Sequence, residues 1–167
     1  LRTKGFNFSV MDVGNNWLEN LPYNKVYTAE RVSYRNLVNG FVPTETAFYK
    51  NPYREWIGAQ IRADIFGYVT PGMPEQGAEL AFKDASLSHV KNGIYGEMFM
   101  SAMISAAFTT NDINEIINIG LSEIPMKSRL AEAMKNVVAW SKKNNDWRDT
   151  WNQINMNYGH YHNVHTI

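Results

Sequence analysis

One histidine, His89, stands in the segment DASLSHVKNG, where its side chain could take part in chemistry. Asp84 precedes it, and two glycines, Gly93 and Gly96, follow it. On an ideal helix the Asp84 and His89 side chains lie about 140° apart, so Asp84 is poorly placed to orient the imidazole. Two interpretations remain: a structural histidine satisfied within the core, or a histidine that faces a ligand where the glycines allow the backbone to approach closely.

The stretch REWIGAQIRAD carries a second group of candidate residues. Glu55 and Arg62 are seven residues apart and Gln60 and Asp64 are four apart, so each pair would share a face if the stretch were helical. A solvated charged face is one interpretation. The surrounding residues are apolar, however, and a buried Arg62 or Asp64 would then need a partner of opposite charge.

Glu97 and three C-terminal histidines are weaker candidates. Glu97 lies near a predicted helix start, where we expect a surface carboxylate that matches the helix dipole. The spacing of His160, His162 and His165 can bind zinc or nickel, but no nearby carboxylate completes a set, so we favour a terminal tail. Imidazoles also do not suit magnesium, which prefers oxygen ligands.

Motifs and composition exclude several other functions. We find no phosphate-binding Gly-Lys-Ser/Thr loop, no G-x-S-x-G, no H-E-x-x-H and no G-x-G-x-x-G, so no catalytic residue can be assigned. Cysteine is absent, which excludes disulfides and thiol chemistry and suits a cytoplasmic protein. Sixteen basic residues balance sixteen acidic ones without a basic stripe, so we expect no nucleic-acid recognition. The longest nearly apolar run, residues 98–108, is too short to span a bilayer, so we expect no membrane segment.

Helical periodicity dominates the chain, and alternating strand patterns are nearly absent. A hydrophobic content of 44% fits one folded domain over residues 1–167. We predict an all-α, compact orthogonal bundle centred on an alanine-rich helix at 95–108. The other helical segments expected are 14–22, 28–40 with Thr28 as N-cap, the end of 54–68, 70–89 from Pro74, 111–125, 127–143 and 145–158.

Residues 51–108 resemble the ADP-ribosylglycohydrolase family. The resemblance rests on the glycine loop IGAQIRAD, followed by DASLSH, a glycine-containing helix start and an alanine-rich helix. It extends from about residue 28 to 125, and more loosely to 167. It implies an all-α fold and hydrolysis of an N- or O-glycosidic bond to ADP-ribose, usually with two magnesium ions (Mg²⁺). The substrate would be an ADP-ribosylated protein or a small ADP-ribosyl or nucleoside compound.

The resemblance also implies roles for five residues. His89 matches a family histidine that approaches the bound ADP-ribose. Gly58 falls in a loop that packs against the ligand, and Arg62 and Asp64 would stabilise that loop. Backbone NH groups near Gly58, or at the helix start after Gly93, could hold phosphate oxygens.

The sequence also departs from the family pattern. Trp56 and Ile57 precede Gly58 where many members have Gly-Asn-Gly, and neither aspartate-rich metal motif is present. We therefore expect the chain to be incomplete at both ends, to lack the magnesium ligands and to be inactive alone. Two alternatives remain: a non-catalytic binder of ADP-ribose or a related nucleotide, and a helical scaffold that uses aromatic residues such as Trp147 and Trp151.

Overall fold

The computed structural model describes residues 1–162 and 164–167, and these residues form helices without strands, as predicted. One isolated antiparallel bridge joins Trp56 and His165. The helical elements, with η for 3-10 helices, are η1 (Gly5–Asn7), α1 (Val10–Asn20), η2 (Tyr23–Lys25), α2 (Thr28–Val38), α3 (Glu45–Phe48), η3 (Gln60–Arg62), α4 (Asp64–Tyr68), α5 (Pro74–Ala85), α6 (Asn92–Ala106), α7 (Ile113–Ser122), α8 (Arg129–Lys143) and α9 (Trp147–Tyr158).

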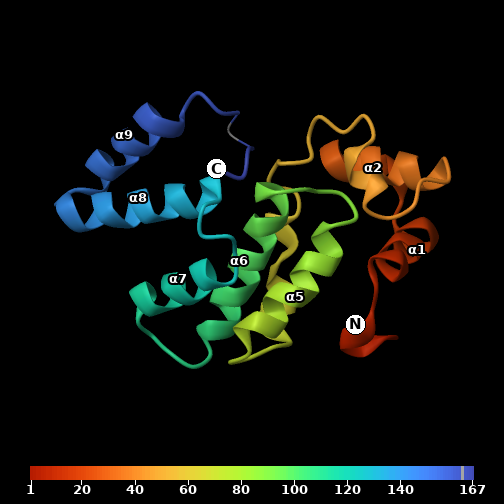
Figure 1. Ribbon diagram of the computed structural model, residues 1–167, viewed down its shortest axis with the longest axis horizontal. Coiled ribbons are helices and arrows are strands. Elements are labelled where there is room, and N and C mark those ends of the chain that lie inside the picture. Colours follow the sequence, from red (N-terminus) through yellow and green to blue (C-terminus); the bar gives the residue numbers. More distant parts are fainter. Residues whose placement is uncertain (163) are drawn as a thin grey trace.

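Helix α6 is the centre of the bundle (Figure 1). It packs against α4, α5, α7, α8 and η3. The small residues Ala102, Ser105 and Ala106 are buried on it, so neighbouring helices approach its backbone closely. Met98 of α6 packs against both apolar clusters of the core, one around Phe66 and Leu80, the other around Phe99 and Leu130. The alanine-rich helix therefore has the central position that the sequence predicted.

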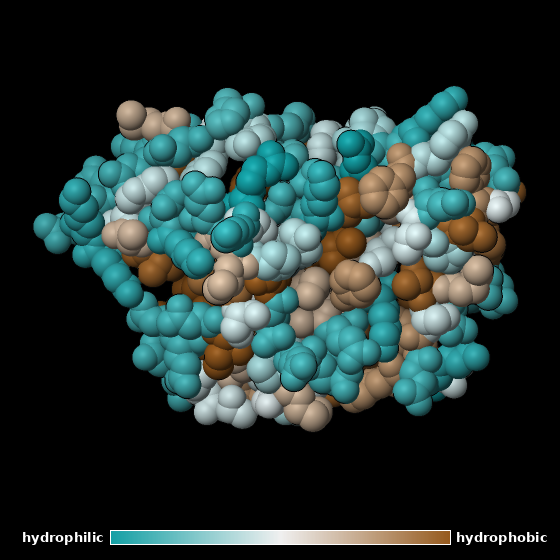
Figure 2. Space-filling model, in the orientation of Figure 1, coloured by the Kyte–Doolittle hydropathy of each residue, from teal (hydrophilic) through white to brown (hydrophobic). Residues whose placement is uncertain are grey.

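The N-terminal helices α1 and α2 lie at one end of the molecule, and α7 to α9 lie at the other (Figure 1). Helix α1 begins with a capping box: the Asp12 backbone NH donates to Ser9 Oγ at 3.2 Å, and the Ser9 NH donates to the Asp12 carboxylate at 2.9 Å. On the face shown in Figure 2, hydrophobic side chains of α7 and α8 are visible in a hollow within a mostly hydrophilic surface.

Two local predictions were wrong. Thr28 is the first residue of α2 rather than its N-cap, which is Tyr27. Helix α6 begins at Asn92, so Gly93 and Gly96 lie inside it. Residues 54–59 are not helical and the helical turns begin at Gln60, as expected for a loop that passes into a helix, so Glu55 and Arg62 do not share a helical face. Before α6, the Val90 NH donates to the Arg54 carbonyl at 2.9 Å, a contact between distant segments that local patterns do not indicate.

The last residues of the chain return to the middle of the sequence. The Ile57 backbone NH donates to the Val164 carbonyl at 2.8 Å, and the Thr166 NH donates to the Glu55 carbonyl at 3.1 Å. The C-terminal residues thus dock on the loop at 53–58 instead of forming a free tail. None of the helices in the described ranges is both long and apolar enough to cross a membrane.

Candidate functional site

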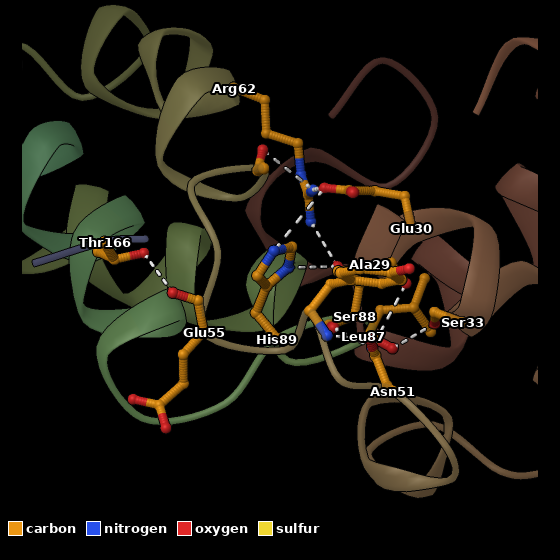
Figure 3. A network of polar contacts seen from close by, with 12 residues as sticks. Ala29, Glu30, Ser33, Asn51, Glu55, Arg62, Leu87, Ser88, His89 and Thr166 are labelled. Atoms are coloured by element: carbon orange, nitrogen blue, oxygen red, sulfur yellow. Dashed lines mark hydrogen bonds and ion pairs between the residues drawn. The ribbon is translucent and has the colours of Figure 1, made fainter. Parts of the chain in front are cut away.

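Arg62, at the end of η3, joins three segments of the molecule (Figure 3). Its Nε donates to Asp84 Oδ2 at 2.5 Å, and its Nη1 donates to Glu30 Oε1 at 2.7 Å. Its Nη2 donates to Ser88 Oγ at 3.1 Å. Because Glu30 lies on α2 and Asp84 on α5, a single guanidinium ties both helices to the loop before η3. The sequence predicted that a buried Arg62 needs a partner, and the structure supplies two.

The Arg62 guanidinium is largely removed from solvent, with 25% of the side chain exposed. The Trp17 ring lies over it, 5.4 Å from the guanidinium carbon to the ring centroid. Burial alone would lower the pKa of Arg62, but the charges of Asp84 and Glu30 oppose burial, and the pKa is raised. The site therefore contains a permanent cation.

His89 lies behind this ion-pair network rather than at an open surface. Its side chain is fully buried, and Nδ1 lies 2.8 Å from Ser88 Oγ. Nε2 lies 3.9 Å from Glu30 Oε1 and has no hydrogen-bond partner among the described residues. Burial, and then the charge of Arg62, lower the pKa of His89 to about 3, so the imidazole is neutral at pH 7. As expected, Asp84 does not orient it.

Three polar side chains fix the turn that carries His89. Ser33 Oγ and Thr46 Oγ1 donate to the Leu87 carbonyl at 2.5 and 2.7 Å, and Asn51 Nδ2 donates to the Ser88 carbonyl at 3.0 Å (Figure 3). All three are buried. They come from positions 37 to 54 residues away, so sequence reasoning missed them. Their bonds satisfy the carbonyls that follow α5 and hold the turn rigid.

A cavity of about 520 Å³ adjoins the network, a size typical of small-molecule sites. Arg62 and Glu30 form its polar wall, and Gly58 also lines it. Its apolar walls include the aromatic residues Trp17, Tyr27 and Trp56. A second cavity of about 480 Å³ is bordered by Trp17 and Asp84. The two ends of the Arg62–Asp84 ion pair therefore border different cavities.

Gly58 lies against the Glu30 carboxylate, which the ion pair with Arg62 holds in place. A Cβ at this position would collide with the Glu30 carboxylate. Gly58, Arg62 and His89 thus meet at one group, Glu30, which the sequence analysis had not singled out. Gly58 and Arg62 line the adjoining cavity, but the buried His89 does not, so the structure does not support its expected contact with a ligand.

Two of the predicted site residues lie elsewhere. Asp64 is exposed on α4, and we find no hydrogen bond of its carboxylate within the described residues, so Glu30 and Asp84 stabilise Arg62 instead. Gly93 is buried, and a Cβ there would lie 2.6 Å from the Arg54 carbonyl oxygen. Its close approach is therefore to the protein's own backbone rather than to phosphate.

The expected surface position of Glu97 was wrong. The sequence suggested a surface carboxylate, but Glu97 is fully buried on α6. Neither of its carboxyl oxygens has a hydrogen-bond partner among the described residues. Burial, and then repulsion by Asp84, raise the pKa of Glu97 well above its usual range, which favours the neutral acid.

The C-terminal histidines pack against the wall of the cavity. The His162 ring stacks on Trp56, with centroids 4.7 Å apart and planes 13° apart, and Tyr53 contacts the same tryptophan edge-on. His165 bridges to Trp56 through the backbone. The predicted terminal tail is therefore docked on Trp56 rather than free.

The described residues do not fit a magnesium site. Within them, no group of three or more His, Asp or Glu side chains is arranged to hold a metal ion. The acidic side chains of Glu30, Asp84 and Glu97 lie around Arg62. The positive guanidinium group therefore already takes the position among them that a bound metal ion would need. We therefore assign no metal-dependent step to these residues.

Comparison with known proteins places the chain in a family. The model of the ADP-ribosylglycohydrolase family matches residues 2–167. The chain belongs to the ADP-ribosylglycohydrolase family. No curated protein and no solved structure matches the chain. Family membership and the helical fold confirm the resemblance seen in the sequence.

Proposed function

We propose that this chain is part of a hydrolase that cleaves an N- or O-glycosidic bond to ADP-ribose. The observation that carries the proposal is the family match over residues 2–167, together with a cavity whose polar wall is the Arg62–Glu30 ion pair. In such a reaction the bond between ribose C1 and the acceptor breaks, water adds at C1, and the acceptor leaves with a proton. The cysteine-free sequence supports a cytoplasmic location for this activity.

In this proposal the described residues bind and orient the substrate. The aromatic rings of Trp17, Tyr27 and Trp56 provide flat surfaces for a base or ribose ring. Lys25, on the cavity lining, supplies positive charge for the diphosphate. Arg62 already donates to Glu30, Asp84 and Ser88, so its role is to keep the wall in place rather than to bind phosphate itself.

No catalytic residue is assigned within the chain. Magnesium ions, if the full protein uses the two that are typical of the family, would need ligands other than the residues described here. We therefore propose that the 167-residue chain alone has no turnover. Measurable hydrolysis by this chain would contradict that proposal and would point to an acid and a base among its own residues.

The deciding experiment measures release of ADP-ribose by the full-length protein from ADP-ribosylated arginine and serine peptides, with magnesium supplied. We expect turnover on at least one substrate and a large loss in Trp56→Ala, with Trp147→Ala as the matched control because Trp147 lies on α9 and is 69% exposed. Loss of turnover in both variants, or in neither, would remove the cavity from the proposal.

Two alternatives are separated by the same experiment. Binding of ADP-ribose without its release from any substrate would favour a non-catalytic binder, an idea motivated by Trp56 in the cavity wall in place of the family's glycine. A helical scaffold is favoured by the exposed Trp147 and Trp151 on α9. It would show neither binding nor turnover.

A further inference from the structure

Glu97 has surroundings in which an ionised carboxylate has no compensation. The residue is fully buried on α6, and both carboxyl oxygens lack a hydrogen-bond partner among the described residues. The charged groups that act on its carboxyl group are Asp84 on α5, Arg62 on η3 and Glu30 on α2, and both α5 and η3 pack directly against α6. A buried carboxylate without a donor is unfavourable because it loses its hydration without replacement.

The charges around Glu97 also do not balance if it ionises. The positive charge of Arg62 is already shared between Asp84 and Glu30, at 2.5 and 2.7 Å. His89, next in the network, adds no charge at neutral pH. With Glu97 ionised the four groups carry three negative charges and one positive. With Glu97 neutral, the net charge of the four groups changes from −2 to −1. The protonated carboxyl group of Glu97 then has an O–H that can donate a hydrogen bond.

We propose that Glu97 is a positioning residue that acts as a neutral acid, whose hydroxyl donates to the Asp84 carboxylate and holds it against Arg62. The proton stays on Glu97, while Asp84 keeps its negative charge and still accepts from Arg62 Nε. Paired carboxyl groups that share one proton are a known solution for two acids in one buried place. Asp84 and Arg62 border the two cavities, so Glu97 stabilises both walls from behind.

This assignment does not depend on which ligand the cavities take, so it can be tested on the protein without ligand. Infrared spectra at pH 7 should contain the C=O band of a protonated carboxyl group, and Glu97→Gln should remove it. The matched control is Glu79→Gln, because Glu79 lies on the surface in a pair with Lys83 and should leave the band unchanged. A wild-type spectrum without the band, or a band that persists in Glu97→Gln, would overturn the proposal.

A second measurement distinguishes positioning from mere packing. The Arg62 Nε–H signal in NMR spectra should exchange slowly with solvent in the wild type and in Glu97→Gln, whose amide can also donate to Asp84. In Glu97→Met, which has similar bulk and no donor, exchange should be faster. Equal exchange in all three proteins would overturn the proposal. If Glu97→Met does not fold, the Glu97→Gln spectra still decide, because slow exchange must survive that change.

Discussion

The part of the chain from α2 to α6 and the C-terminal helices α7 to α9 place their polar groups differently. Between residues 28 and 106, buried and half-buried side chains such as Ser33 and Arg62 are joined to partners 54 and 22 residues away in sequence. On α9, the ion pair of Arg148 and Asp146 is local and its side chains are 68% and 47% exposed. The hollow between α7 and α8 is lined mainly by apolar residues and lysines (Figure 2).

Burying an ion pair has a free-energy cost because both charges lose their hydration. Apolar packing, as between α7 and α8, stabilises a fold without this loss of hydration. The concentration of such pairs beside the aromatic cavity supports the proposal that the α2–α6 part binds the substrate. The predictions below test this difference between the two regions.

The largest effect is expected for Arg62→Met. The change leaves the Glu30 and Asp84 carboxylates without their cation, and breaking a partly buried pair of this kind costs about 3–5 kcal/mol. Urea unfolding measures it. The control Arg148→Met, at an exposed pair, should change the free energy of unfolding by less than about 0.5 kcal/mol. Similar losses in both variants would mean that the two regions do not differ in this respect.

Acid should act next most strongly, through His89. Its folded pKa of about 3 lies below the usual 6.5. The stability it contributes is complete above pH 6.5 and is lost as pH falls through 3. At pH 4 the wild type should have lost about 3 kcal/mol relative to His89→Gln, each compared with its own value at pH 7. NMR titration checks the cause: a His89 imidazole that protonates near pH 6.5 would refute it.

Gly58→Ala should have an intermediate effect. The new Cβ collides with the Glu30 carboxylate, and forcing them apart should cost about 1–3 kcal/mol. In the Glu30→Ala variant the carboxylate is absent, so adding Gly58→Ala should leave the free energy of unfolding nearly unchanged. A double-mutant cycle measures this coupling. Additive effects would show that Gly58 and Glu30 do not constrain each other.

The C-terminal residues should have a smaller but measurable effect through Thr166. Its hydroxyl donates to the Glu55 carbonyl at 3.0 Å, and Thr166→Val should cost about 1 kcal/mol. The control Thr110→Val removes an exposed bond to Glu115 and should cost less than about 0.5 kcal/mol. If the two variants melt alike, the docking of the C-terminal residues contributes nothing to the wall.

The smallest effect is expected on α9. Trp151 is 57% exposed, so Trp151→Ser should leave the free energy of unfolding within about 0.5 kcal/mol of wild type. Analytical ultracentrifugation of the same variant bears on the scaffold alternative. A wild-type dimer that Trp151→Ser dissociates would assign a contact surface to the C-terminal helices and would weaken their contrast with the α2–α6 part.

Most of the architecture could be predicted from the sequence, since helix periodicity, Pro74 at a first turn and the small residues of α6 are local signals. The site could be predicted in part. Arg62 was found because a charge in an apolar stretch needs a partner, and the same reasoning applies to Glu97, which stands among apolar neighbours on α6. Its position near a helix start favoured the wrong interpretation.

Other members of the site have no local signal. Glu30 lies at the start of α2, where a carboxylate is ordinary, and its bond to Arg62 spans 32 residues. Ser33 reaches Leu87 across 54 residues. Such contacts depend on how the helices are arranged, which the pattern of a single sequence does not determine.

The hydrogen bond between Thr166 and Glu55 spans 111 residues. During synthesis on a ribosome, the segment that contains Trp56 emerges long before the residues that hold it in place. The bundle around α6 can therefore form while one wall of its cavity still lacks support. That wall is complete only once Thr166 has been synthesised, so translation products that end before it would have the core but an unfinished pocket.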